Sequence, residues 1–260
     1  MIDDFEKLDG ALLAARYAFM PNKLRYCGGD SNAELFEYAV HNASDAGLAE
    51  MLKEFETMFP YLRLIAQANK IADPFNYKVV EAYWLGNELL ENVSMNNFYR
   101  YLVDEQKIKK KLKPELFEKV FGKIPAGAKP HHSFHVFNIP KRTGHYPVKH
   151  TIMTMDDCRI TAAKIINLKS KVDEPVSNSN FTKKILVEYQ PLIFRDKGLI
   201  LGSAIEREAW TEINDKTFVQ NLKVGDWVSL HWGWVCDRLT ELQAMNLNKW
   251  TDYNLRLTNL

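Results

Sequence analysis

The sequence changes its pattern at one place, the run Ile124-Pro125-Ala126-Gly127-Ala128-Lys129-Pro130, where small residues and two prolines suppress regular structure. Before this run, apolar residues recur at helical spacing; after it, short β-rich segments alternate with turn residues. We therefore predict an α+β protein in three parts: an all-α helical domain over residues 1–123, a histidine-rich junction over 124–150, and a β-rich domain with a C-terminal helix over 151–260.

The expected elements follow from capping residues, prolines and the spacing of apolar side chains. Helices are predicted at 10–20, 33–41, after a cap at Ser44 or Asp45, from Pro60, from Asp73-Pro74, at 95–104 and from Pro114. Strands are predicted at 135–137, 151–154, 160–168, 184–189, 192–194, 199–206 and 227–231. A final helix over 240–257 is expected to turn Leu242, Met245, Trp250, Tyr253 and Leu257 toward the strands.

The bulk properties exclude several classes of partner. A formal net charge of +1 provides no overall field for nucleic acid or an anionic membrane. No run approaches the ~20 apolar residues of a spanning helix, and the acidic amino terminus is not a secretory signal. Cys27, Cys158 and Cys236 form an odd set without a CxxC pair, which favours a reducing cytoplasm over a disulfide framework.

Cys158 lies in the run Asp156-Asp157-Cys158-Arg159-Ile160, at the start of a predicted strand. A thiolate is a soft, strong ligand for iron, zinc or copper, and the edge of a sheet would leave it within reach. The two flanking carboxylates would raise its pKa unless a metal or a cation offsets them. A buried structural cysteine is the alternative interpretation.

His231 ends the apolar run Trp227-Val228-Ser229-Leu230-His231 and comes shortly before Gly233, which permits an unusual backbone turn. Its imidazole could be a metal ligand, a proton carrier or a core histidine whose hydrogen bonds are satisfied.

These two segments together resemble the HypC/HupF family of hydrogenase maturation chaperones. One similarity is a strand that opens with Cys158 and continues as Ile-x-x-x-Lys followed by two apolar residues. The other is the run Lys-Val-Gly-Asp-Trp-Val-Ser-Leu-His-Trp-Gly that contains His231, where a Gly-Asp turn leads into an apolar strand ending in His-x-Gly. The similarity covers about the last 100 residues, and the family's cysteine stands at the mature amino terminus whereas Cys158 is internal.

The resemblance implies a small OB-like β-barrel with a C-terminal helix over 151–260. It further implies that Cys158 binds an iron atom carrying cyanide and carbonyl ligands, with His231 as its companion, and that a hydrogenase large subunit or another maturation protein receives the metal group. The protein would then be a metal-centre assembly or accessory factor.

A third group of candidate ligands is the histidine cluster of the junction, in Pro130-His131-His132-Ser133-Phe134-His135. The preceding proline favours a strand or loop, and the glutamate of the HExxH motif is absent. Iron, nickel or zinc could bind His131, His132 and His135, or the three rings could form hydrogen bonds across a polar junction. His145 and His150 follow nearby, while Cys27 could reach a metal or be an ordinary loop cysteine.

Two other functions remain compatible with the sequence. The histidine cluster and Cys158 could line a non-haem iron or zinc enzyme site between the domains. The β-rich domain could instead serve only as an interaction scaffold without metal. The aromatic run Ala82-Tyr83-Trp84-Leu85-Gly86-Asn87 could contact the histidines or simply allow close helix packing.

Overall fold

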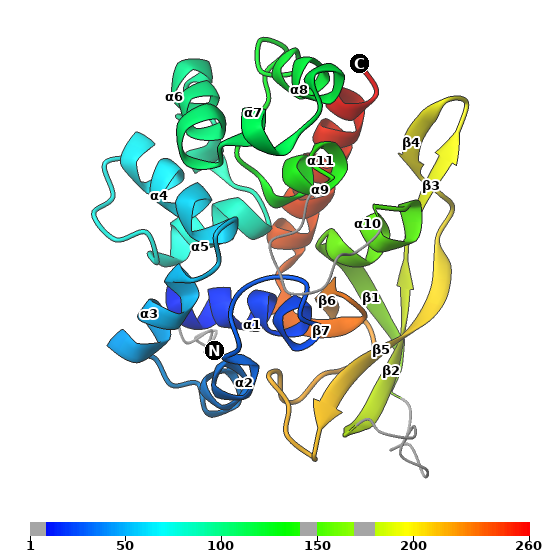
Figure 1. The fold of residues 1–260 in the computed structure, drawn as a ribbon. Coiled ribbons are helices and arrows are strands. Elements are labelled where there is room, and N and C mark those ends of the chain that lie inside the picture. The colour runs from blue at the N-terminus through cyan, green and yellow to red at the C-terminus, as the bar shows by residue number, and fades with distance from the viewer. Residues whose placement is uncertain (1–8, 141–149, 169–179) are drawn as a thin grey trace.

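The protein is a mixed α and β molecule in which a series of helices precedes a mostly antiparallel five-stranded sheet and a C-terminal helix (Figure 1). The computed structural model describes residues 9–140, 150–168 and 180–260. The amino-terminal residues 1–8, the part of the predicted junction at 141–149 with His145, and residues 169–179 lie outside the described residues. No helix within the described ranges combines the length and apolar character needed to cross a membrane.

The helices that precede the sheet are short, and several of them begin at a polar side chain that accepts a backbone N–H. They are α1 (Gly10–Lys23), α2 (Asn32–His41), α3 (Ala46–Lys53), α4 (Met58–Ala68), α5 (Tyr77–Trp84), α6 (Met95–Arg100), α7 (Ile108–Lys111), α8 (Pro114–Phe121), α9 (His132–Asn138) and α10 (Ile152–Cys158), with the 3-10 turn η1 (Glu88–Leu90) and the π-helical turn η2 (Tyr101–Glu105).

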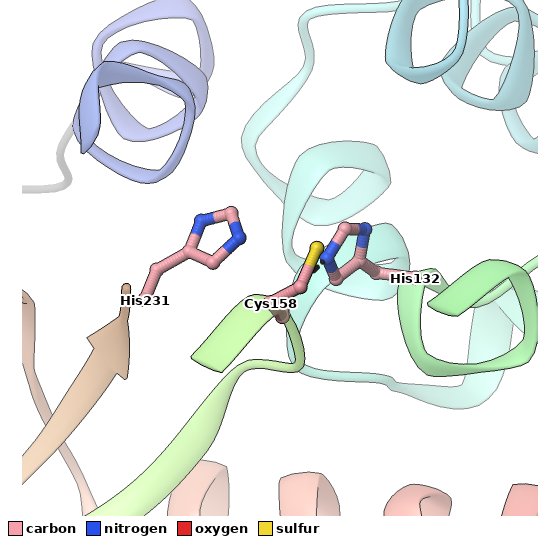
Figure 2. Close-up of side chains that lie close together, drawn as sticks. All are labelled: His132, Cys158 and His231. Atoms are coloured by element: carbon pink, nitrogen blue, oxygen red, sulfur yellow. Dashed lines mark hydrogen bonds between the residues drawn. The ribbon is translucent and has the colours of Figure 1, made fainter. Parts of the chain in front are cut away.

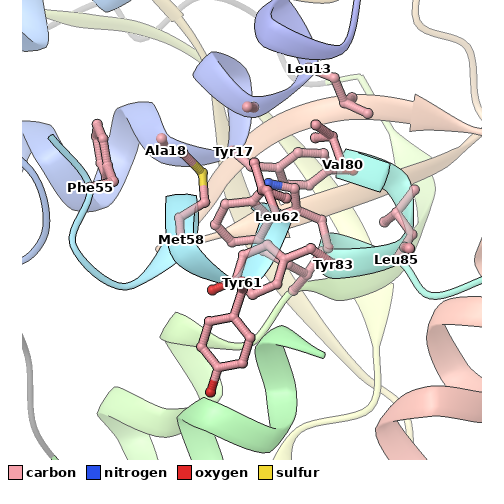
Figure 3. Packing of buried hydrophobic residues seen from close by; sticks show 14 of the residues in the cluster. Leu13, Tyr17, Ala18, Phe55, Met58, Tyr61, Leu62, Val80, Tyr83 and Leu85 are labelled. Carbon is pink, nitrogen blue, oxygen red and sulfur yellow. The ribbon is translucent and has the colours of Figure 1, made fainter. Parts of the chain in front are cut away.

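Helix α1 is the centre of the helical part. The Asp9 carboxylate accepts the N–H groups of Ala11 and Leu12, and every residue from Gly10 to Asn22 is buried. Pro21 was expected to end this helix, but it lies inside the last turn, and the helix continues to Lys23. Figure 3 shows the apolar and aromatic side chains of α1, α4 and α5 packed together, Tyr17, Tyr61 and Tyr83 among them.

Each of the five main strands pairs with two neighbours. The hydrogen-bonded order is β1-β2-β5-β7-β6, and β6 returns to β1. Among the described residues, the strands pair antiparallel except at Trp210 of β5 and Trp234 of β7, which form a parallel pair. The strands are β1 (Thr161–Asn167), β2 (Phe181–Tyr189), β5 (Ile205–Ile213), β6 (Trp227–His231) and β7 (Trp234–Leu239), with a separate hairpin of β3 (Leu192–Arg195) and β4 (Gly198–Leu201).

The C-terminal helix α11 (Glu241–Thr258) joins the two parts. The Thr240 hydroxyl accepts the Gln243 N–H, and the Gln243 side chain accepts the Thr240 N–H, which forms a capping box. Trp250 packs against Gly86, where φ is +85° and an added Cβ would lie 2.0 Å from the indole ring. The largest core cluster contains residues from the early helices, from β7 and from α11, so the two parts share buried surface.

The structure confirms the predicted strand over 227–231 and the final helix, and it corrects three other predictions. Residues 135–137 and 151–154 were expected to be strands but belong to α9 and α10. Local capping outweighs their β-type composition, because the His131 side chain caps α9 and a Thr151–Thr154 capping box starts α10. The helix expected from Asp73-Pro74 begins later, at Tyr77, where Asn76 is the cap.

The prediction that the apolar side chains of the final helix turn toward the strands does not hold for Trp250, which packs against Gly86 and the His131 ring. Trp250 and Leu257 are buried, but Leu242 and Met245 are 66% and 67% exposed. Both exposed residues lie in the first turns of α11, on the side away from its buried residues Ala244 and Leu247.

Candidate metal centre

Three side chains from separate elements bring metal-ligating atoms together. His132 begins α9, Cys158 ends α10 and His231 ends β6. One ligand atom from each residue lies within 4.8 Å of the others, and all three residues are buried. Figure 2 shows the Cys158 sulfur beside the His132 ring, with the His231 ring facing them. We call these three residues the donor cluster.

His231 is positioned by a tight hairpin. The loop between β6 and β7 is the pair Trp232-Gly233, with φ values of +53° and +72°, as a two-residue type I′ turn requires. The Nδ1–H of His231 donates to the Tyr17 carbonyl of α1 at 2.7 Å. In the neutral ring, this bond puts the lone pair on Nε2, which is the arrangement found in metal-binding histidines.

Cys158 is held at the same place by the backbone. It ends helix α10, where the sequence predicted the start of a strand, and β1 begins only at Thr161. The Trp232 N–H donates to the carbonyl of Asp157 at 2.7 Å, which joins the end of α10 to the turn that follows His231. Cys158 is only 3% exposed, so it lies in the interior and not at the reachable sheet edge expected from the sequence.

The two acidic neighbours of Cys158 are both paired with arginines. The Arg159 Nε donates to the Asp156 carboxylate at 2.9 Å, and the Arg207 guanidinium donates to Asp157 at 3.2 Å. The same Asp156 carboxylate accepts the Leu192 N–H of β3 at 2.9 Å. The cations therefore offset the carboxylates near the thiol, while the Arg207 and Leu192 contacts link α10 to β5 and β3.

His132 links the donor cluster to the helices. Its Nε2–H donates to the Cys158 carbonyl at 2.9 Å, because a carbonyl can only accept, and its Nδ1 accepts the Tyr83 hydroxyl at 3.1 Å. Burial, followed by the nearby His231, holds the pKa of His132 well below its ordinary value. A neutral imidazole is the form that binds metal ions. The Trp84 ring packs on the His132 ring, with 4.5 Å between the ring centroids, so the aromatic run of α5 does contact a histidine of the cluster.

The other two junction histidines are not members of the donor cluster, although His135 lines the same cavity. The His131 ring turns toward α11, with its Nδ1 2.6 Å from the Ser133 hydroxyl and its plane stacked on Trp250. His135 faces Tyr61, with 3.4 Å between its Nδ1 and the phenol oxygen. His131 and His135 therefore have different partners, and a ligand role for either residue stays a prediction.

A small cavity of about 40 Å³ lies against the donor cluster. Its walls are formed mainly by apolar and aromatic side chains from α1, α4 and α5, and it is lined by Ala18, Pro21, Cys27, Phe55, Thr57, Met58, Tyr83, Trp84, His132, His135, Cys158 and His231. Among these residues only Cys27 and Thr57 are partly exposed. The sequence offered no signal for Ala18, Phe55 or Thr57, because the fold alone brings them to this cavity.

The sequence comparison covers the helices and the sheet together. The profile of a family of unknown function, DUF6390, matches residues 6–260, and the chain belongs to this family. No curated protein and no solved structure matches the chain. The family description names no activity, so the chemistry of the donor cluster has to carry the functional inference.

Proposed function

We propose that this protein binds a transition-metal ion through His132, Cys158 and His231. The main support for this proposal is that one thiol and two imidazoles are buried together, although three separate elements contribute them. Such a set suits iron, zinc or copper, whereas carboxylate-rich sites suit magnesium or calcium. Within the set, we assign Nε2 of His231, whose Nδ1 is held by Tyr17. His132 would bind through Nε2 only after this atom gives up its hydrogen bond to the Cys158 carbonyl and the ring proton moves to Nδ1, where the Tyr83 oxygen can accept it.

The proposed biological role is a metal-centre assembly or accessory factor in a reducing cytoplasm, with iron as the cargo. Two of the three donors, Cys158 and His231, lie in the segments that resemble the hydrogenase maturation chaperones. The ring of strand pairings, in which β6 returns to β1, supports an OB-like barrel for this part of the chain. A hydrogenase large subunit or another maturation protein would be the recipient, and cyanide and carbonyl ligands would accompany the iron.

Metal analysis of protein purified without oxygen tests the binding site. We expect about one metal ion per chain in the wild type and loss of that metal in Cys158→Ala, because a thiolate ligand is removed. Cys236→Ala is the matched control, since Cys236 is also buried but lies in the core beside Trp234. Metal-free, folded wild-type protein would refute the site, as would equal metal content in both variants.

The carrier role needs a separate test. Protein co-expressed with hydrogenase genes should contain iron and show infrared bands of cyanide and carbonyl, and Cys158→Ala should lose both. Absence of the bands in iron-containing protein would overturn the carrier role while leaving the metal site intact.

The cavity beside the donor cluster favours one alternative, a non-haem iron or zinc enzyme. With three protein ligands, a metal here would keep an open position, and a bound metal would supply Lewis-acid or redox chemistry. The residues would hold the ion and exclude bulk water, because all three are buried. An enzyme would retain its metal when a recipient protein is added, whereas a carrier would release it.

A further inference from the structure

The cavity at the donor cluster is small and mostly apolar. Its volume is about 40 Å³, and Ala18, Phe55, Met58 and Trp84 contribute to its walls. A single water molecule needs at least ~10–15 Å³ measured in this way, so the space could hold a few waters or one very small molecule. Because apolar walls offer water few hydrogen bonds, the cavity suits a neutral apolar guest better.

The loop between α1 and α2 limits what can reach this space. The Asn22 side-chain amide donates to the carbonyls of Cys27 and Gly29 at 2.9 and 2.7 Å. Gly28 has a φ of +79°, and an added Cβ would lie 2.5 Å from the Phe55 ring, so loop and ring are in close contact. Cys27 and Thr57 are the partly exposed residues among those that line the cavity.

We propose that this cavity admits a neutral gas molecule of two atoms, such as dioxygen or nitric oxide, to the donor cluster, and that it excludes organic substrates. The size of the cavity and its apolar walls are properties of the protein without a bound metal. Only the placement of the gas beside a metal rests on the proposed function.

Xenon is the probe for the cavity, because it binds dry apolar cavities and needs no metal. We expect the ¹²⁹Xe chemical shift of metal-free protein to saturate with xenon pressure. Ala18→Val, which fills the space, should weaken xenon binding at least about tenfold. Thr57→Val is the matched control, since it keeps the volume and should leave xenon binding unchanged or slightly stronger. If Ala18→Val fails to fold, Thr57→Ile fills the cavity from its partly exposed side.

Nitric oxide and imidazole are the probes for the loaded protein. Without oxygen, ferrous protein should change its absorption and electron paramagnetic resonance spectra on addition of nitric oxide, but not on addition of imidazole, which is too large. Ala18→Val should suppress the nitric oxide response at unchanged iron content. Iron-loaded protein that ignores nitric oxide, or binds imidazole equally well, would overturn the gas inference alone. Xenon binding by protein that takes up no metal would overturn the metal site and leave the cavity proposal standing.

Discussion

Helix α9 carries two neighbouring histidines into two different buried polar clusters. His132 meets Tyr83, Cys158 and His231 on the side of the cavity. His131 faces α11, where Asn254 and Trp250 lie beside it, and it also contacts Ser133 of its own helix; we call these four residues the helix cluster. Both rings are buried, and burial lowers the pKa of both.

The difference between the clusters lies in the chemistry of the neighbours. In the helix cluster the neighbours are a hydroxyl, an amide and an indole, which are weak ligands, and the His131 side chain also caps α9. In the donor cluster the neighbours are a thiol and a second imidazole beside a cavity. A buried neutral histidine alone therefore does not indicate a metal site. The donor cluster differs from the helix cluster because a thiol and a second imidazole lie beside its histidine.

The largest expected effect separates the two histidines directly. His132→Ala should weaken metal binding by at least about 100-fold, more than the loss of an outer-shell partner usually does. His131→Asn, which keeps a capping side chain, should leave metal affinity within about threefold. Competition titration with a chromophoric chelator measures both. Equal losses in the two variants would erase the proposed distinction.

The second expected effect is the pH dependence of stability in metal-free protein. Burial lowers the pKa of His131 to about 3, whereas an unfolded histidine titrates near 6.5. The unfolded state therefore binds more protons below pH ~6.5, and each such histidine removes about 1.4 kcal/mol of stability per pH unit as the pH falls toward its folded pKa.

Urea unfolding between pH 7.5 and 4.5 measures this slope. His131→Asn should reduce the slope of unfolding free energy against pH by the contribution of about one proton, because the asparagine side chain does not titrate in this range. An unchanged slope would mean that the helix cluster protonates as readily as an unfolded chain.

A smaller effect is expected at Tyr83, whose hydroxyl hydrogen-bonds to the Nδ1 atom of His132 in the donor cluster. In the metal-free protein its hydroxyl donates to His132 Nδ1. When Nε2 binds a metal, Nδ1 carries the proton, and the same oxygen can accept it. Tyr83→Phe should therefore weaken metal binding about tenfold. Tyr61→Phe, which alters the neighbouring contact to His135, is the control. Tighter binding in Tyr83→Phe would indicate that Nδ1 is the ligand.

The smallest effect is expected at the Asp157–Arg207 ion pair. The two side chains are 34% and 25% exposed, so water screens their attraction. Arg207→Ala should cost less than about 1 kcal/mol of unfolding free energy and change metal affinity by less than about twofold. Thermal melting and the same chelator titration test this, and a loss comparable to that of His132→Ala would show that the pair positions Cys158.

The sequence predicts strand β6 better than helices α9 and α10, but it does not predict β7, the strand that pairs with β6 after His231. Strand β6 is predicted residue for residue, because its apolar run lies between the turns at Gly225-Asp226 and Trp232-Gly233. Helices α9 and α10 are missed because their residues favour strands on average, while single caps at His131 and Thr151 and burial in the core decide the outcome.

The sequence also predicts only part of the site, namely two of the three residues of the donor cluster. Cys158 and His231 stand out by their motifs, and the structure places them together. His132 is one of three candidate histidines, and the sequence does not distinguish it, because successive residues of a helix point about 100° apart. Choosing among the three requires the position of α9 relative to α10 and α11, which only tertiary packing sets.

X-ray absorption spectroscopy of the metal-loaded chain tests the central claim most directly, because it counts the ligand atoms and measures their distances. With zinc as the probe, we expect one sulfur at about 2.3 Å and two imidazole nitrogens at about 2.0–2.1 Å, with a light atom completing the shell. A shell without sulfur, or one unaltered in Cys158→Ala, would contradict the account.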